Sequence, residues 1–405
     1  MTVTVPEQLR PLRQPIFAML WSATVLANLG FWLQDITMSW LMADLTVSPA
    51  QIALLPVAMQ LPIFLLSLPA GALADRTDLR RFLLITQSLL VLLILGFSAL
   101  LAFGTVSIMT ILLFAFASGT IMAVSAPARQ AVLPSIVEQQ DLRSAVMLSA
   151  IGYNASRAVG PMIGGLLLAA FGPLIAMLSY AGSCVLVALA LLKWRPKTIA
   201  QKPSTSFTHD IREGVRHVLT RPDLRGGLLA TLVFFVLISP VWAFLPLIAK
   251  GYAKENTEIF SMFLMSIGVG AVIGGFIKRL INSKTFSMTL RNGVFITAVA
   301  MALIATVDNI AVALFGFFSV GLGWIAVGGG VNAYVLTRAD AAYRARAISF
   351  MMIVLAGGLS IGSLFWGQIA QIIGANGAML SGGVLLALLG VYLHVRPFTE
   401  TPSPA

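Results

Sequence analysis

The sequence predicts an all-α membrane protein with twelve transmembrane helices, arranged as two parallel six-helix repeats. Three observations support this prediction: the apolar content, the length of the apolar blocks, and a one-sided distribution of lysine and arginine. Of the 405 residues, 58% are hydrophobic and only 10% are charged. Soluble globular proteins carry about 25% charged residues, so this composition cannot cover a water-exposed surface.

The apolar residues form twelve blocks, each long enough to cross a bilayer, which takes about 20 residues in a helix. The predicted spans are 16–42, 51–74, 82–103, 107–126, 144–170, 173–193, 226–250, 259–281, 286–306, 309–331, 347–373 and 376–395. The first block has no small-residue cleavage site, so we expect it to remain as the first span. Before the second span, Ser48 can cap a helix whose first turn accommodates Pro49.

The basic residues predict the orientation of these spans. All but three of the 26 lysines and arginines lie in the two termini and in alternate loops; the exceptions are Lys250, Lys254 and Arg157. By the positive-inside rule these loops and both termini are cytoplasmic. An even number of spans also places both termini on one side. The net charge of +11 is therefore a topology signal and not a nucleic-acid-binding patch.

The chain divides into four predicted parts: an N-terminal six-helix half, a cytoplasmic linker, a C-terminal six-helix half and a tail. Their ranges are 1–193, 194–225, 226–396 and 397–405. In the linker, apolar positions at helical spacing from Asp210 onward predict a short amphipathic helix. We expect this helix to lie flat on the membrane surface, with a soluble regulatory helix as the alternative.

The two halves resemble each other in sequence. Gly71–Arg76 aligns with Gly274–Arg279, and the segment from Arg143 to Gly172 aligns with that from Arg344 to Gly374. Each pair follows the same span of its half. Because six is an even number of spans, the repeats are parallel and related by an axis along the membrane normal.

The loop from Gly71 to Arg81 resembles the signature between the second and third spans of the major facilitator superfamily, although Asp78 replaces its last glycine. The resemblance implies a latch that stabilises the outward-facing state, in which a carboxylate accepts hydrogen bonds at a helix N-terminus. A generic basic turn is the alternative. The latch residues are Gly71, Asp75, Arg76, Arg80 and Arg81.

A second motif lies in the fifth span and comprises Gly160, Pro161, Gly164 and Gly165. It resembles the end of a motif associated with antiporters. Small residues let helices pack closely, and the proline bends the span. Because the upstream glycines of that motif are out of register here, helix packing without a link to transport direction is the alternative.

Longer matches in the first half resemble the group that contains the enterobactin exporter. They are Trp40–Pro49, Leu61–Gly71, Pro127–Pro134 and Asn154–Pro161. The resemblance implies a monomer in the bacterial inner membrane that exports siderophores or similar amphipathic small molecules, with a proton gradient and no cofactor. One departure concerns the fourth span, where Ala115 replaces the arginine that many proton-coupled drug exporters carry four residues before the glycine matched by Gly119.

Asp35 is the acidic residue that the predicted spans place deep in the membrane. An ionised aspartate there costs about 2.5–3.5 kcal/mol, and burial lets a carboxyl group load and release protons near neutral pH. In the superfamily fold the first and fifth spans are neighbours, so Arg157 is its expected partner. We expect Asp35 to couple transport to protons, with Arg157 tuning it or binding an anionic cargo. A structural ion pair is the alternative.

Five further side chains are expected to line the same cavity: Trp32, Gln34, Met38, Trp242 and Phe244. A pocket lined by aromatic and methionine side chains suits bulky amphipathic ligands. For each residue alone, packing or lipid contact is the alternative.

These observations favour secondary active efflux by alternating access, in which the two halves rock around a site at mid-membrane, and proton antiport is the expected drive. The alternatives are uptake or uniport of a small solute, and a non-transporting receptor or scaffold. An enzyme is disfavoured because the sequence holds no nucleophile–base set, phosphate loop or metal site. Its three histidines are scattered, and Cys184 is its single cysteine.

Overall fold

A computed structural model describes residues 7–75, 77–195, 216, 220–252, 257–277, 286–339 and 344–396. Every regular element within these ranges is a helix. Two short 3-10 helices are η1 (Glu7–Arg13) and η2 (Gln139–Asp141). The α-helices are α1 (Pro15–Leu45), α2 (Pro49–Asp75), α3 (Leu79–Ala102), α4 (Ile108–Ile136), α5 (Leu142–Lys193), α7 (Pro222–Tyr252), α8 (Thr257–Ile277), α9 (Phe286–Thr306), α10 (Ile310–Arg338) and α11 (Arg344–Val395).

Ten helices in the described part of the chain are long and apolar enough to cross a membrane. The two longest, α5 and α11, have 52 residues each. Each contains one glycine with non-helical backbone angles, Gly172 in α5 and Gly374 in α11. Their φ angles are 75° and 77°, in the region that a residue without a Cβ atom enters without strain. Each glycine lies between two predicted spans.

Local sequence sets several helix ends. Asp78 precedes α3 and its carboxylate accepts a hydrogen bond from the Arg81 amide at 2.9 Å. Ser107 and Thr110 form a reciprocal capping box at the start of α4. Pro49 begins α2 as predicted, but the Ser48 hydroxyl accepts its hydrogen bond from Gln371 of α11. The predicted amphipathic helix of the linker lies outside the described residues.

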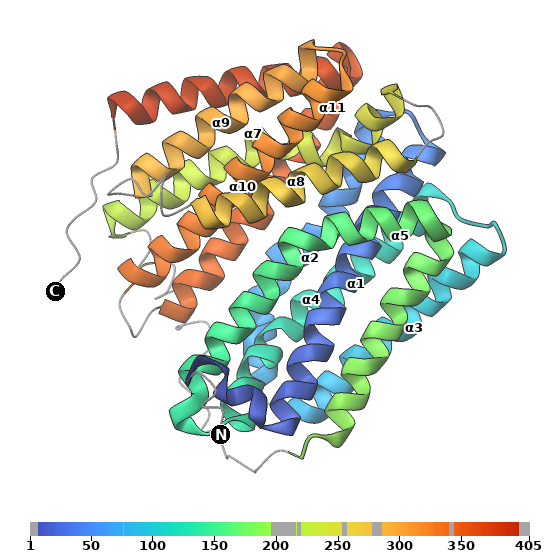
Figure 1. Ribbon diagram of the computed structural model, residues 1–405, viewed down its shortest axis with the longest axis vertical. Helices are drawn as coiled ribbons and strands as arrows, with labels where there is room; N and C mark the ends of the chain where they lie inside the picture. The colour runs from blue at the N-terminus through green and yellow to red at the C-terminus, as the bar shows by residue number, and fades with distance from the viewer. Residues whose placement is uncertain are drawn as a thin grey trace, which may run out of the picture.

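The helices form two groups, α1–α5 and α7–α11, which lie side by side (Figure 1). In the first group α1 packs on α5, α2 on α4, and α3 on α5. In the second group α7 packs on α11, α8 on α10, and α9 on α11, so the pairing has the same pattern. Between the groups, α2 packs on α11 and α5 on α8. These two contacts are equivalent, because α2 occupies the same place in the first group as α8 in the second, and α5 the same place as α11.

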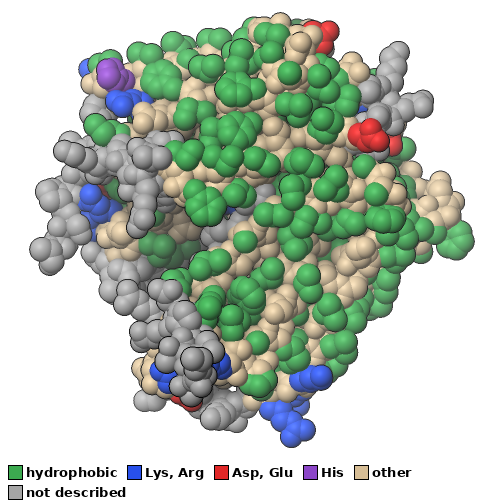
Figure 2. Space-filling model, viewed as in Figure 1, with side chains coloured by type: hydrophobic (Ala, Val, Ile, Leu, Met, Phe, Trp, Pro, Cys, Tyr) green, Lys and Arg blue, Asp and Glu red, His purple; other side chains and the backbone are tan. Residues whose placement is uncertain are grey.

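Apolar side chains cover the middle of the face seen in Figure 2, and lysine and arginine side chains lie along its left and lower edges. A membrane-facing surface of this kind leaves large apolar side chains exposed, as at Leu92 and Ile85 of α3, which are 65% and 60% exposed. The polar face needed by a soluble helix bundle is missing from this helix.

Candidate functional site

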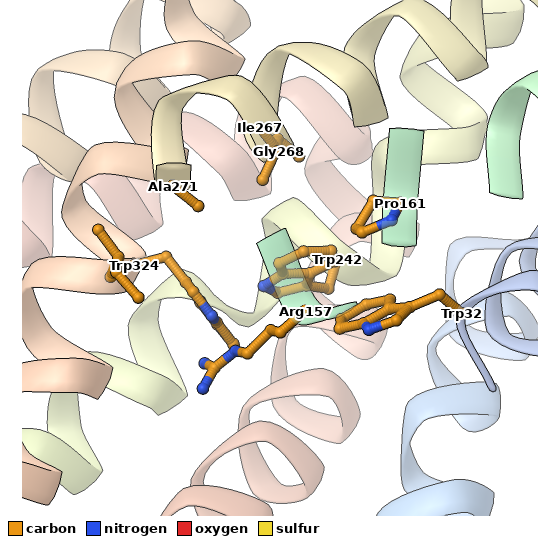
Figure 3. Close-up of a pocket in the computed structure, with 9 residues that line it drawn as sticks. Trp32, Arg157, Pro161, Trp242, Ile267, Gly268, Ala271 and Trp324 are labelled. Atoms are coloured by element: carbon orange, nitrogen blue, oxygen red, sulfur yellow. The ribbon is translucent and has the colours of Figure 1, made fainter. Parts of the chain in front are cut away.

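A cavity lies between the two groups of helices, and both groups contribute to it (Figure 3). Its position at the contact of two similar halves is the usual place of a transporter's binding site. The lining residues are Trp32 of α1, Arg157 and Pro161 of α5, Trp242 of α7, Ile267, Gly268 and Ala271 of α8, and Trp324 and Ile325 of α10.

Three tryptophans form one side of the cavity. The ring centroids of Trp32 and Trp242 are 6.4 Å apart, and those of Trp242 and Trp324 are 5.0 Å apart with planes at 67°. Phe235 extends the cluster, since its ring centroid lies 5.0 Å from that of Trp324. Edge-to-face contacts of this kind fix aromatic side chains relative to each other. The indole N–H of Trp242 is buried and has no hydrogen-bond partner among the described residues.

Arg157 extends from α5 in the first group to α10 in the second. Its guanidinium carbon lies 5.0 Å from the ring centroid of Trp324, a cation–π contact. Gly328 leaves room for it, because a Cβ atom there would lie 3.3 Å from the Arg157 Nη2 atom. Within the described residues, Arg157 forms neither an ion pair nor a hydrogen bond. No carboxylate of the described residues therefore lies within ion-pair distance of its positive charge.

The expected ion pair between Asp35 and Arg157 is absent from the part of the chain that the structure describes. Arg157 turns toward Trp324, on the far side of the cavity. Asp35 is half-buried and likewise forms no hydrogen bond or ion pair with the described residues. The two charged side chains are therefore separate features rather than one neutralised pair.

Three residues predicted to line the cavity lie elsewhere. Gln34, Met38 and Phe244 are fully buried, with 0% exposure, and none of them contacts the cavity. Met38 and Phe244 pack in two different apolar clusters, and the one with Phe244 also includes residues of the first group such as Ile36. Gln34 connects α1 to α4, because its amide nitrogen donates to the Ser118 hydroxyl at 3.1 Å. The faces of α1 and α7 that carry these side chains turn into the bundles.

The fifth-span motif holds α5 against its neighbours. An added Cβ atom would lie 2.3 Å from Trp32 at Gly160 and 2.7 Å from Ile36 at Gly164. At Gly165 the neighbour is Ser261 of α8, whose hydroxyl donates to the Gly165 carbonyl at 2.6 Å. Pro161 lines the cavity itself. The motif thus positions α5, and with it Arg157, between α1 and α8.

The latch sequence is described in part. The Arg80 guanidinium donates to the carbonyls of Leu191 and Leu192 at 3.1 and 2.6 Å, at the end of α5. A cation at a helix C-terminus is favoured by the unpaired carbonyls there. The Arg81 side chain is exposed. Of the remaining latch residues, Gly71 and Asp75 belong to α2, but the Asp75 side chain and all of Arg76 lie outside the described residues.

A second contact between the two groups lies where α1 ends, and we call Trp40, Ala43, Asp44 and Lys250 the gate contact. The Lys250 ammonium forms an ion pair with Asp44 and donates to the Ala43 carbonyl at 2.8 Å. It also lies 5.2 Å from the ring centroid of Trp40. Lys250 lies in the last turn of α7, so one side chain joins the two groups at this end of the bundle.

Sequence reasoning missed Trp324, the tryptophan against which Arg157 stacks. Trp324 carries no charge and belongs to no recognised motif; its one signal in the sequence is its large aromatic side chain within the glycine-rich sequence of α10. Gly328 also belongs to no recognised motif and was missed. Both residues gain their significance from Arg157, which is far away in the sequence.

The pattern of one family, described as transmembrane secretion effector, matches residues 7–403. The staphyloferrin A transporter of Staphylococcus aureus is 25% identical over 62% of this chain, and the match spans 64% of that transporter. The multidrug efflux pump Tap of Mycolicibacterium fortuitum is 26% identical over 95% of this chain and 96% of its own. The enterobactin exporter EntS of Shigella boydii serotype 18 is 23% identical over 82% of this chain and 81% of its own.

A similar fold occurs in a solved structure, that of a bacterial homologue of the human lysosomal transporter Spinster. It superimposes with a TM-score of 0.74 over 98% of this chain and all of the other, at 13% sequence identity. The relatives and this structural neighbour are transporters and not enzymes. Since the family pattern covers nearly the whole chain, the protein is a multi-pass membrane protein that belongs to the transmembrane secretion effector family of the major facilitator superfamily.

Proposed function

We propose that this protein exports a small amphipathic metabolite across the bacterial inner membrane by alternating access, driven by proton antiport. The observation that carries the proposal is the cavity between the two groups of helices, lined by three tryptophans and one arginine. Aromatic walls bind the apolar part of a cargo, and a charged group fixes its orientation. The siderophore transporters and the multidrug pump among the relatives support a siderophore-like or drug-like cargo.

The proposal includes twelve spans in two parallel repeats, with both termini in the cytoplasm. A straight helix of 52 residues would be about 78 Å long, against about 30 Å for the bilayer core. The breaks at Gly172 and Gly374 let α5 and α11 each cross twice. The shared helix pairing of the two groups supports the repeat. The basic residues in the termini and alternate loops support the orientation.

Alternating access requires that contacts at the two ends of the cavity form and break in turn. The gate contact joins the groups at the end opposite the start of α1, because Lys250 lies in the last turn of α7 and Asp44 lies next to the end of α1. With the proposed orientation this end faces the cell exterior. Export then needs Lys250 to separate from Asp44 once cargo has bound from the cytoplasm.

Asp35 is the proposed proton-carrying group. It lies in the middle of α1, is half-buried, and has no ion-pair partner among the described residues that would hold it ionised. Ala115 leaves α4 without the arginine that serves related exporters. A carboxyl group that gains a proton when one end is open and loses it when the other is open couples the proton gradient to the motion.

The experiment is transport in proteoliposomes with an imposed pH gradient, using a cargo found by screening siderophores and amphipathic dyes. Asp35→Asn is expected to abolish gradient-driven flux while cargo exchange without a gradient continues. Asp308→Asn, the same change at an exposed aspartate between α9 and α10, serves as the control for coupling. Gradient-driven flux that persists in Asp35→Asn would refute the proton role. Accumulation in the opposite direction would favour uptake instead.

A further inference from the structure

Arg157 is a permanent positive charge inside the membrane-spanning part of the protein, and it has no ion-pair partner in the part of the chain that the structure describes. A guanidinium has five N–H donors, no acceptor, and stays protonated in proteins. Within the described residues, its observed contacts are the face of Trp324 and the space at Gly328. Trp324 makes a cation–π contact with one face of the guanidinium, while the N–H groups at its edge have no acceptor among the described residues. A charged side chain inside a membrane is costly in free energy unless an anion or water accepts its hydrogen bonds.

The residues around Arg157 indicate which class of anion the cavity would bind. Trp32, Trp242 and Trp324 present ring surfaces to the same cavity, and the nearby α8 positions are small or apolar (Figure 3). The cavity therefore combines a guanidinium that has no acceptor among the described residues with aromatic stacking surfaces, and its lining holds no carboxylate that would attract a cation.

We propose that the cavity selects anionic aromatic cargo, with Arg157 paired to the anionic group and the three tryptophans stacked on the ring. This inference rests on the proposed function and specifies its substrate class. Arginine binds a carboxylate or a catecholate oxygen pair through two parallel N–H···O bonds, which a neutral or cationic cargo does not offer. A hydrophobic cation of the same size would be repelled by Arg157.

The position of Arg157 also connects cargo binding to the two halves. The arginine belongs to α5 in the first group, but its guanidinium rests on Trp324 in the second. An anion bound to it therefore contacts both groups at once. Selectivity for the anion is thus built from residues on α5, α7 and α10, and neither half carries it alone.

The test is isothermal titration calorimetry of the full-length protein in nanodiscs, with empty nanodiscs as the blank. Three naphthalene compounds of similar size serve as probes: naphthoate, naphthamide and naphthylmethylammonium. The wild-type protein is expected to bind naphthoate about tenfold more tightly than naphthamide, since charge-assisted hydrogen bonds are the stronger ones, and to bind the ammonium compound most weakly.

Three variants separate charge from folding. Arg157→Gln is expected to lose the preference for naphthoate while its affinity for naphthamide stays within about threefold, which also shows that the cavity is intact. Arg157→Lys is expected to keep part of the preference. Arg225→Gln makes the same change at an exposed position at the start of α7 and is expected to behave as the wild type.

Equal affinity of the wild-type protein for the three compounds would overturn the inference, even if no Arg157 variant folds. An unchanged preference in a folded Arg157→Gln protein would overturn it as well. The binding assay uses no gradient, so it is independent of the proposed transport. Tight naphthoate binding without gradient-driven flux would refute proton antiport alone, whereas gradient-driven flux of cations without this preference would refute the anionic cargo alone.

Discussion

Replacing Lys250 by methionine tests whether the gate contact holds one end of the transporter closed. Methionine keeps an unbranched apolar side chain but removes the ammonium group. The ammonium reaches Asp44, the Ala43 carbonyl and the face of Trp40. Because α7 and α1 belong to different groups of helices, these contacts exist only while this end is closed. Their loss is expected to shift the population toward the state that is open at this end.

The structure sets the size of the shift. The side chains of Lys250 and Asp44 are 20% and 48% exposed, so the ion pair is solvent-screened and contributes about 0.2–1 kcal/mol. The contact of the ammonium with Trp40, which is 7% exposed, adds about 0.5–1 kcal/mol. A total of about 1–2 kcal/mol corresponds to a change of about 5- to 30-fold in the ratio of open to closed states. Asp44→Asn leaves the Trp40 contact in place and should give the smaller effect.

The assay is double electron–electron resonance between spin labels at Val47→Cys and Ile372→Cys. These positions are 84% and 86% exposed and lie on opposite groups near the gate contact. The native Cys184 is buried, which limits background labelling. Lys250→Met is expected to enlarge the long-distance population, and Lys193→Met at the exposed end of α5 is the control. A distance distribution in Lys250→Met that matches the wild type would refute the closing role of this contact.

Two further predictions concern packing and the latch, and both are measured as thermal unfolding in detergent. Gly165→Ala places a Cβ atom 2.9 Å from the Ser261 backbone and is expected to destabilise the protein by about 1–3 kcal/mol, whereas Gly182→Ala meets no atom within 4 Å. Equal melting temperatures for these two variants would contradict the close α5–α8 packing. Arg80→Ala removes two hydrogen bonds at the end of α5 and should cost about 1–3 kcal/mol, more than Arg81→Ala at an exposed position. An equal loss in both would show that Arg80 acts only through its charge.

The sequence alone determined where the chain is helical. A stretch of about 20 apolar residues has to satisfy its backbone hydrogen bonds internally in a membrane, and a helix does so locally. Glycine and proline then place the breaks, as at Gly172, Gly374 and Pro49. The superfamily was equally accessible, because its signature from Gly71 to Arg81 is a continuous stretch. These features depend on neighbours in the chain and not on the packing of distant helices.

The tertiary structure decided which residues share the cavity. Trp32 and Trp242 line it as predicted, but Phe244, two residues beyond Trp242, faces the core, since residues so close on a helix point in different directions. Arg157 meets Trp324 rather than Asp35 because the rotation of α5 directs it toward α10. That rotation depends on the packing of Gly160 and its neighbouring glycines against α1 and α8, which involves residues far apart in the sequence.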